Sequence, residues 1–210
     1  SIVRKSVKNF KIKYMYPLFE SIRVEGGNVY LLQYHQKRLE RSYLYMFKKK
    51  CAWQLNSMIP ELPKEGSFKL RFLYNKDRFT FELLPYTSRK IERLKLIEID
   101  SYSYDHKFTD RSGLDNAYKL RGDCDDVLIN KNGFLTDTSY CNILLFDGSQ
   151  WVTPEKPLFE GVQREFLIDQ QRVIPKQIHV NDLSDFISFQ LINALNPFEE
   201  NQFEAVGGIL

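Results

Sequence analysis

The segment from Asp100 to His106 constrains the architecture of this 210-residue chain most, because it is polar and aromatic and has no periodicity. Strand-like and helix-like runs lie on both sides of it. We therefore expect a mixed α/β (α+β) protein of two lobes with a cleft between them. The N-terminal lobe would be residues 1–99 and the connection residues 100–106. The C-terminal lobe, residues 107–210, would contain a barrel-like sheet.

Hydrophobic periodicity and turn residues predict the elements of each lobe. In the N-terminal lobe we expect strands at 18–25, 29–32, 68–74, 78–84 and 94–99, and helices at 34–47 and 51–58. In the C-terminal lobe we expect helices at 114–120 and 162–171, strands at 126–130, 141–146, 151–152 and 177–180, and an apolar stretch at 186–195.

Charge and cysteine content exclude several classes of function. The 30 basic and 27 acidic residues give a net charge of +3, without the concentrated basic face of a nucleic-acid-binding protein. No apolar run approaches the ~20 residues of a membrane helix, and the N-terminus lacks the apolar core of a signal peptide. Three widely spaced cysteines form no disulfide or metal-ligand pattern. We therefore expect a cytoplasmic protein that binds no nucleic acid, membrane or metal.

Four groups of short segments carry side chains suited to chemistry. No Ser-His-Asp order, glycine-rich phosphate loop or metal-ligand cluster offers a competing site. In chain order the groups are Leu18–Val24 with His35–Leu39, then Lys107–Arg111, then Gly133–Ile143, and last Thr153–Pro154 with Leu158–Arg164.

In order and approximate spacing these segments resemble the class IV aminotransferase family, the fold-type IV enzymes that use pyridoxal phosphate (PLP). The resemblance extends from about Pro17 to about Phe198. The Gly133–Ile143 segment is the most specific, because glycine, an acidic residue, serine and asparagine precede an apolar strand at fixed separations. The family includes branched-chain and D-amino-acid aminotransferases and aminodeoxychorismate lyase. The resemblance therefore implies a homodimeric PLP enzyme with a small-molecule substrate.

The resemblance gives Lys107 and Asp137 the central roles. Lys107 matches the lysine that forms a Schiff base with PLP and moves protons at the substrate α-carbon, which requires a partly desolvated amine. Without the motif, a surface lysine would be the simpler interpretation. Asp137 stands where the family has a glutamate opposite the pyridine nitrogen, and it is one methylene shorter. A turn-capping role is the alternative for Asp137, and this change also supports a non-catalytic binding protein with the same fold.

A phosphate site follows from the same resemblance. Gly161 precedes a predicted helix, so the amides of Val162 and Gln163 would point free N–H groups at an anion. Glycine would let the backbone come close to that anion. Family members often have threonine in place of Gln163, so we do not expect its side chain to be a ligand. Asn193 would close the phosphate site.

Arg38 matches the family arginine that braces the phosphate, a task that suits a planar guanidinium. A surface ion pair with Glu40 or Glu20 is the alternative interpretation of Arg38. His35 is expected to be structural, whereas His106 adjoins the lysine and could line the cleft.

The reaction is less constrained than the cofactor. An arginine four residues after Lys107, and the pair Asn193-Ala194, are similar to the lyase pattern, in which pyruvate is eliminated and 4-aminobenzoate, a folate precursor, remains. An amino-acid transaminase of the branched-chain or D-amino-acid type is the alternative. Candidates for binding a substrate carboxylate are Arg23, Arg71 and Arg78. Tyr74 and Tyr104 are candidate cofactor neighbours or core residues.

Overall fold

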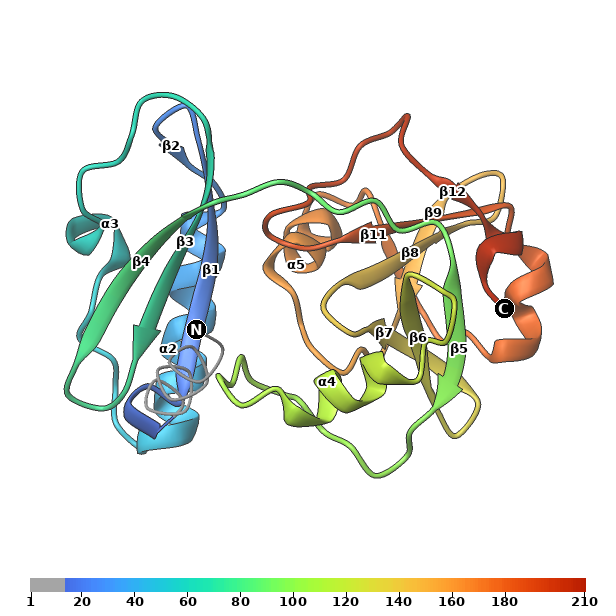
Figure 1. Ribbon diagram of the computed structural model, residues 1–210, viewed down its shortest axis with the longest axis horizontal. Coiled ribbons are helices and arrows are strands. Elements are labelled where there is room, and N and C mark those ends of the chain that lie inside the picture. The colour runs from blue at the N-terminus through green and yellow to red at the C-terminus, as the bar shows by residue number, and fades with distance from the viewer. Residues whose placement is uncertain (1–13) are drawn as a thin grey trace. The chain divides into compact units, whose positions relative to one another are not determined.

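The computed structural model describes residues 14–210, which form two compact units. The first unit runs to Thr87 and also includes His106–Arg111, and the second consists of Ser88–Asp105 and Ser112–Leu210. Both combine strands and helices (Figure 1). The boundary predicted at residues 100–106 differs from the boundaries of these units. Residues 94–98 pair with a strand of the second unit, and residues 107–109 pair with a strand of the first.

The first unit is a four-stranded antiparallel sheet in the order β2-β1-β3-β4, with one long helix packed on it (Figure 1). Its helices are α2 (Leu32–Phe47) and the short α3 (Leu55–Met58). Its strands are β1 (Leu18–Glu25), β2 (Asn28–Val29), β3 (Ser67–Tyr74) and β4 (Phe79–Pro85).

Alternate residues along β1 point to the core of the first unit, and most of them are apolar. Leu18, Ile22 and Val24 face the core and are fully buried, and burying a side chain of this size contributes ~2 kcal/mol. The turn between β1 and β2 consists of Gly26 and Gly27, which have φ angles of 55° and 77° and therefore suit glycine. The predicted strand 29–32 is wrong beyond Val29, because Leu31 adopts a left-handed conformation and helix α2 starts at Leu32.

The second unit contains an eight-stranded sheet in which β10, β9, β8, β7, β6 and β5 follow one another, while β11 pairs with both β8 and β12. Its helices are α4 (Ser112–Lys119), α5 (Val162–Asp169) and the 3-10 turns η1 (Val180–Asp185) and η2 (Val206–Gly208). Its strands are β5 (Leu94–Glu98), β6 (Asp126–Lys131), β7 (Phe134–Thr138), β8 (Asn142–Phe146), β9 (Trp151–Pro154), β10 (Ile174–Lys176), β11 (Ser188–Ile192) and β12 (Glu204–Ala205).

Two differences from the sequence prediction bear on the site. Strand β7 was not predicted, because its sequence Phe-Leu-Thr-Asp-Thr is too polar to indicate a buried strand, although all but the first residue are buried. The predicted strand 177–180 is wrong, because the His179 side chain accepts a hydrogen bond from Asn181 N and starts the turn η1. Strand β10 lies just before it instead.

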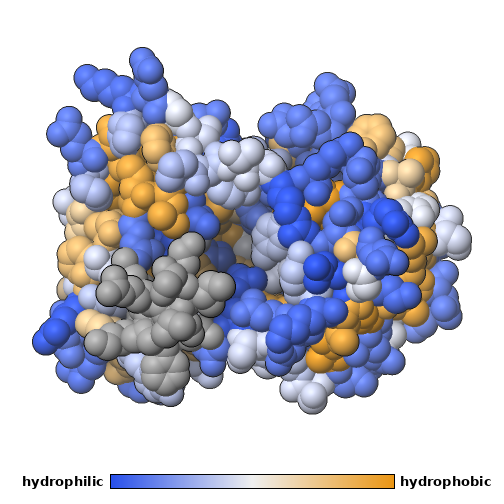
Figure 2. All heavy atoms as spheres, viewed as in Figure 1, coloured by the Kyte–Doolittle hydropathy of each residue, from blue (hydrophilic) through white to orange (hydrophobic). Residues whose placement is uncertain are grey.

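Apolar side chains also reach the surface of both units. Figure 2 shows apolar patches between hydrophilic residues on the face displayed. Phe79, Leu83 and Leu84, all on β4, are each more than a third exposed. Within residues 14–210, no helix is long and apolar enough to span a membrane.

Candidate active site

In the first unit the segment that contains Lys107 lies along strand β1. The Phe19 amide donates to the Lys107 carbonyl at 3.1 Å, and the Thr109 amide donates to the Pro17 carbonyl at 2.8 Å. The Lys107 side chain is half-buried, with Nζ 5.1 Å from the centroid of the Phe19 ring. The backbone on both sides of Phe108 is therefore fixed next to β1, and the Lys107 amine lies beside an aromatic ring.

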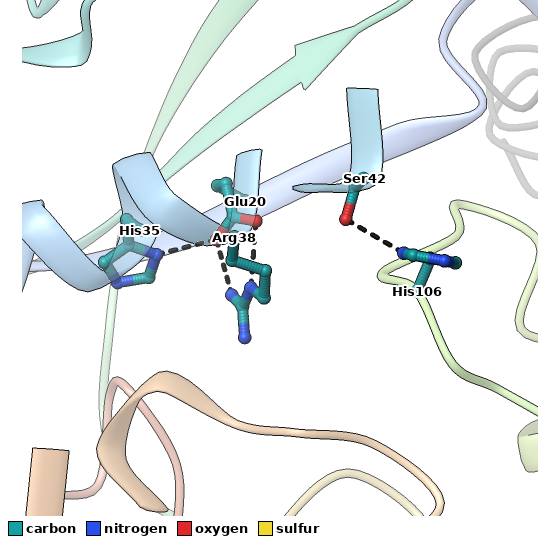
Figure 3. A network of polar contacts seen from close by, with 5 residues as sticks. All are labelled: Glu20, His35, Arg38, Ser42 and His106. Atoms are coloured by element: carbon teal, nitrogen blue, oxygen red, sulfur yellow. Dashed lines mark hydrogen bonds and ion pairs between the residues drawn. The ribbon is translucent and has the colours of Figure 1, made fainter. Parts of the chain in front are cut away.

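Arg38 is held by a buried carboxylate. Figure 3 shows Arg38 and His35, both from α2, directed at Glu20 of β1. Arg38 Nε donates to Glu20 Oε1 at 3.0 Å, and Nη2 donates to Oε2. His35 Nδ1 lies 2.6 Å from the same Oε2. Glu20 and His35 are fully buried and Arg38 is 3% exposed, so the ion pair considered from sequence exists but is not a surface pair.

Electrostatics fix the charges in this cluster. Burial alone would raise the pKa of Glu20, but the Arg38 charge and the hydrogen bonds from His35 and Arg38 lower it to about 2. Burial lowers the pKa of His35 and, with the positive charges of Arg38 and Lys107, outweighs the hydrogen bond and charge of Glu20, which raise it. His35 is therefore neutral and Nδ1 carries the proton that it shares with the Glu20 carboxylate. Its buried Nε2 has no hydrogen-bond partner among the described residues.

His106 ties the Lys107 segment to the same helix. Its Nδ1 lies 3.2 Å from Ser42 Oγ (Figure 3), and its ring stacks on Tyr45 with centroids 4.0 Å apart. His106 is 8% exposed, so it packs against α2 within its own unit. Tyr74 is fully buried in the core of this unit, which supports the core interpretation of that residue.

The three candidate substrate arginines have different surroundings. Arg71 Nη1 contacts Glu82 at 2.7 Å, and its guanidinium carbon lies 5.1 Å from the Phe19 ring that Lys107 also contacts. Arg23 pairs with Glu25 and covers the Tyr30 ring. Arg78 lies in the exposed turn between β3 and β4. Of the three, Arg71 is the one that the structure brings to the same aromatic ring as Lys107.

In the second unit, Asp137 of β7 is buried and doubly hydrogen-bonded. Its Oδ1 accepts from Asn142 Nδ2 at 2.7 Å, and its Oδ2 accepts from the Phe159 amide at 2.8 Å. Burial raises the pKa of Asp137 to about 7, although these hydrogen bonds and the Arg164 charge lower it. Asp137 thus takes a proton far more readily than an exposed carboxylate. Tyr104, the second tyrosine considered as a cofactor neighbour or core residue, has its ring centroid 5.7 Å from that of Phe159.

The predicted phosphate residues lie at the start of α5. Gly161 is the N-cap residue, with no side chain to cap the helix, and its carbonyl accepts from Glu165 N at 3.0 Å. Val162 and Gln163 are 1% and 5% exposed. Their amides belong to the first turn of the helix, where intrahelical acceptors are lacking.

Asn193 caps its own turn. Its Oδ1 accepts from the amides of Leu195 and Asn196 at 2.8 and 2.9 Å, and its Nδ2 lies 3.1 Å from Cys141 Sγ. These contacts fix the end of β11 next to the residue that precedes β8.

Sequence reasoning did not identify how several residues position these groups. Glu20 was considered only as a surface partner of Arg38, although it alternates along β1 with Leu18 and Ile22 and so lies on an apolar face, where a charge needs a buried partner. Asn142 was quoted within a motif but given no role. No sequence signal indicated that the Phe159 backbone would contact Asp137.

Comparisons with known proteins agree with the resemblance. The sequence profile of the family described as amino-transferase class IV matches residues 17–198. A Haemophilus influenzae protein of uncharacterised function is 32% identical over 187 residues, which cover 87% of this chain and 99% of that protein.

Two solved structures are also similar. A proposed 4-amino-4-deoxychorismate lyase from Haemophilus somnus 129pt has a TM-score of 0.82 and 34% identity over 87% of this chain and 98% of that one. The PLP-bound form of a hypothetical aminotransferase from Mycobacterium tuberculosis has a TM-score of 0.73 over 87% of this chain and 78% of that one. At 15% identity, the second likeness shows the fold alone. The predicted family and the mixed α/β fold are confirmed.

Proposed function

Because the chain belongs to the amino-transferase class IV family of PLP-dependent enzymes, we propose that it binds PLP as a Schiff base on Lys107. The observation that carries this assignment is the placement of Lys107. Its backbone is fixed to β1, the residue is half-buried, and its Nζ lies 5.1 Å from the centroid of the Phe19 ring. A lysine that attacks an aldehyde must be partly removed from water and held in one place.

The chemistry of the donor set fits this cofactor. Asp137 is a buried carboxylate suited to face a protonated pyridine nitrogen, even though it is shorter than the family's glutamate. Arg38 and the Val162 and Gln163 amides would bind the phosphate, since a guanidinium and a helix N-terminus both favour anions. When bound, PLP supplies an electron sink for the charge that develops at the amino-bearing carbon of the substrate.

The residues of this chain would divide the remaining work. The Lys107 amine would move a proton at the amino-bearing carbon, which requires a base within hydrogen-bond reach. Arg71 is our candidate for binding a substrate carboxylate, because it contacts the same Phe19 ring as Lys107. Glu20 would hold the Arg38 guanidinium in one orientation.

For the reaction, we favour the lyase over the transaminase. The arginine at position 111, four residues after Lys107, supports this choice, as does the 34% identical protein from Haemophilus somnus. The substrate would then be aminodeoxychorismate, and the products pyruvate and 4-aminobenzoate. The enzyme would act in the cytoplasm in folate biosynthesis; its buried free cysteines suit a reducing compartment.

Absorbance tests the cofactor assignment. We expect purified protein reconstituted with PLP to show a visible band of lysine-bound cofactor. Lys107→Ala and Lys107→Arg should both lose it, because neither side chain can form the imine, while exposed Lys119→Ala should keep it. Wild-type protein that stays colourless after reconstitution would defeat the proposal.

Substrate assays separate the reactions. Aminodeoxychorismate should give 4-aminobenzoate and pyruvate, and Lys107→Ala should abolish both products. Amino-group transfer from amino acids to 2-oxoglutarate, without 4-aminobenzoate formation, would make the protein a transaminase. Cofactor binding without turnover in either assay would indicate a non-catalytic binding protein.

A further inference from the structure

Three hydrogen bonds form a closed ring around Asp137 in the second unit. Asn142 Nδ2 donates to Asp137 Oδ1 at 2.7 Å and to the Phe159 carbonyl at 2.8 Å. The Phe159 amide donates to Asp137 Oδ2 at 2.8 Å and closes the ring. Because both partners of the Asn142 amide group are acceptors, its NH₂ group must face them. The ring joins β7, β8 and the segment that leads into α5.

Gly161, two residues after Phe159, leaves the space that Asn142 occupies. A Cβ atom at position 161 would lie 2.2 Å from Asn142 Oδ1 and 3.3 Å from its Cγ, and no other atom of residues 14–210, apart from the two chain neighbours, comes within 4 Å. The Gly161 backbone has φ −73° and ψ 143°, which any L-residue adopts. Glycine is therefore required here by a neighbouring side chain and not by the backbone conformation.

We propose that Asn142 is a positioning residue that fixes the Asp137 carboxylate and the start of α5 in one geometry, and that Gly161 is glycine in order to admit it. The inference deepens the proposed function and rests on it. In that function Asp137 faces the ring nitrogen of PLP, while the amides after Gly161 bind its phosphate. These two contacts belong to one rigid ligand, so a fixed separation between carboxylate and helix start favours its binding.

A double-mutant cycle tests the coupling. We expect Asn142→Ala and Gly161→Ala each to weaken PLP binding ~10- to 100-fold in an absorbance titration, the range for losing hydrogen bonds to a charged group. The double variant should bind no more weakly than Asn142→Ala, because without the Asn142 side chain the new methyl group meets nothing. Asn116→Ala, at an exposed residue of α4, and Gly207→Ala, where a Cβ meets no atom of the described residues within 4 Å, are the matched controls and should bind as wild type.

Two measurements on the cofactor-free protein make the test independent of turnover. The pKa of Asp137, followed by NMR of its carboxyl carbon against pH, should be higher in Asn142→Ala than in wild type. The reason is that the Asn142 hydrogen bond, present only in wild type, lowers this pKa. Gly161→Ala should lower the melting temperature in the wild-type background and leave it unchanged in the Asn142→Ala background. Circular dichroism checks that each variant is folded.

If Gly161→Ala lowered PLP affinity and melting temperature equally in the wild-type and Asn142→Ala backgrounds, the coupling would be overturned. The glycine would then be needed for the close approach of the ligand. Unchanged PLP affinity and Asp137 titration in Asn142→Ala would overturn the positioning role. If wild-type protein binds no PLP, the proposed function fails. The melting temperatures of the cycle then still decide whether Asn142 is the reason for Gly161.

Discussion

At the scale of single residues, the buried charges of the first unit depend on Glu20. Its carboxylate contacts both Arg38 and His35, and all three side chains are at most 3% exposed. A buried charge is tolerated only when it is paired and hydrogen-bonded. Glu20 therefore has a structural role that precedes any part Arg38 plays in phosphate binding.

We expect Glu20→Ala to lower the free energy of unfolding by ~3–5 kcal/mol, because it leaves a buried guanidinium and an imidazole N–H without their acceptor. Glu40→Ala is the matched control, since Glu40 lies on α2 with His35 and Arg38 but is exposed, and should change stability by less than ~0.5 kcal/mol. Urea unfolding measures both. Similar values for the two variants would contradict the buried pair.

Because of the Glu20 carboxylate, we expect the stability of the protein to fall in acid. The folded pKa of Glu20, about 2, lies below its ordinary value of 4.5, so the unfolded chain takes up the proton first as pH falls. The stability that Glu20 contributes, about 3 kcal/mol, is present above pH 4.5 and is lost as pH falls toward 2. Unfolding curves across this range should show a loss that is absent in Glu20→Gln.

Asp137 predicts the opposite dependence at higher pH. Its folded pKa of about 7 lies above the ordinary value of 3.8, so the folded state holds its proton more tightly than the unfolded state. Stability of the cofactor-free protein should therefore fall between about pH 4 and pH 7, by up to ~4 kcal/mol. Asp137→Asn should remove this slope in urea unfolding curves, and an unchanged slope would place its origin at another group.

At the scale of elements, helix α2 carries the polar cluster of the first unit. His35, Arg38 and Ser42 follow at intervals of three and four residues and so lie on one face of the helix. Two of them contact Glu20 of β1, and Ser42 contacts His106 of the Lys107 segment. One helix thus positions both the candidate phosphate arginine and the segment of the candidate Schiff-base lysine.

Ser42→Ala should loosen the His106–Arg111 segment, because it removes the hydrogen bond that ties His106 to α2. We expect the Phe108 and Thr109 amides, which donate to the His106 and Pro17 carbonyls, to exchange with solvent several-fold faster. Hydrogen exchange followed by NMR measures this. Ser57→Ala, at an exposed residue of α3, should leave both rates unchanged, and equal exchange in the two variants would show that Ser42 does not hold the segment.

Local patterns predicted most elements but not the contacts between them. The strand at 18–25 and the helix up to Phe47 follow from alternation and helical spacing, which local sequence encodes. Strand β7 was not predicted, because neighbouring strands bury it and its own composition does not indicate burial. The Asp137–Asn142–Phe159 ring was not predicted, because Phe159 is 22 residues from Asp137 and contributes only backbone atoms to it. Backbone atoms are the same for nearly every residue type, so the sequence does not indicate such a contact.

At the scale of the whole molecule, the resemblance implies a homodimer. A second subunit would have apolar surface to bury, because Leu83 and Leu84 of β4 are exposed and Figure 2 shows apolar patches on the face displayed. We expect size-exclusion chromatography with light scattering to give twice the chain mass of 24.9 kDa. Dilution that lowers this mass toward the single chain should also lower PLP retention if each site needs the second subunit. A monomer that retains PLP and full activity would show that each chain is complete by itself.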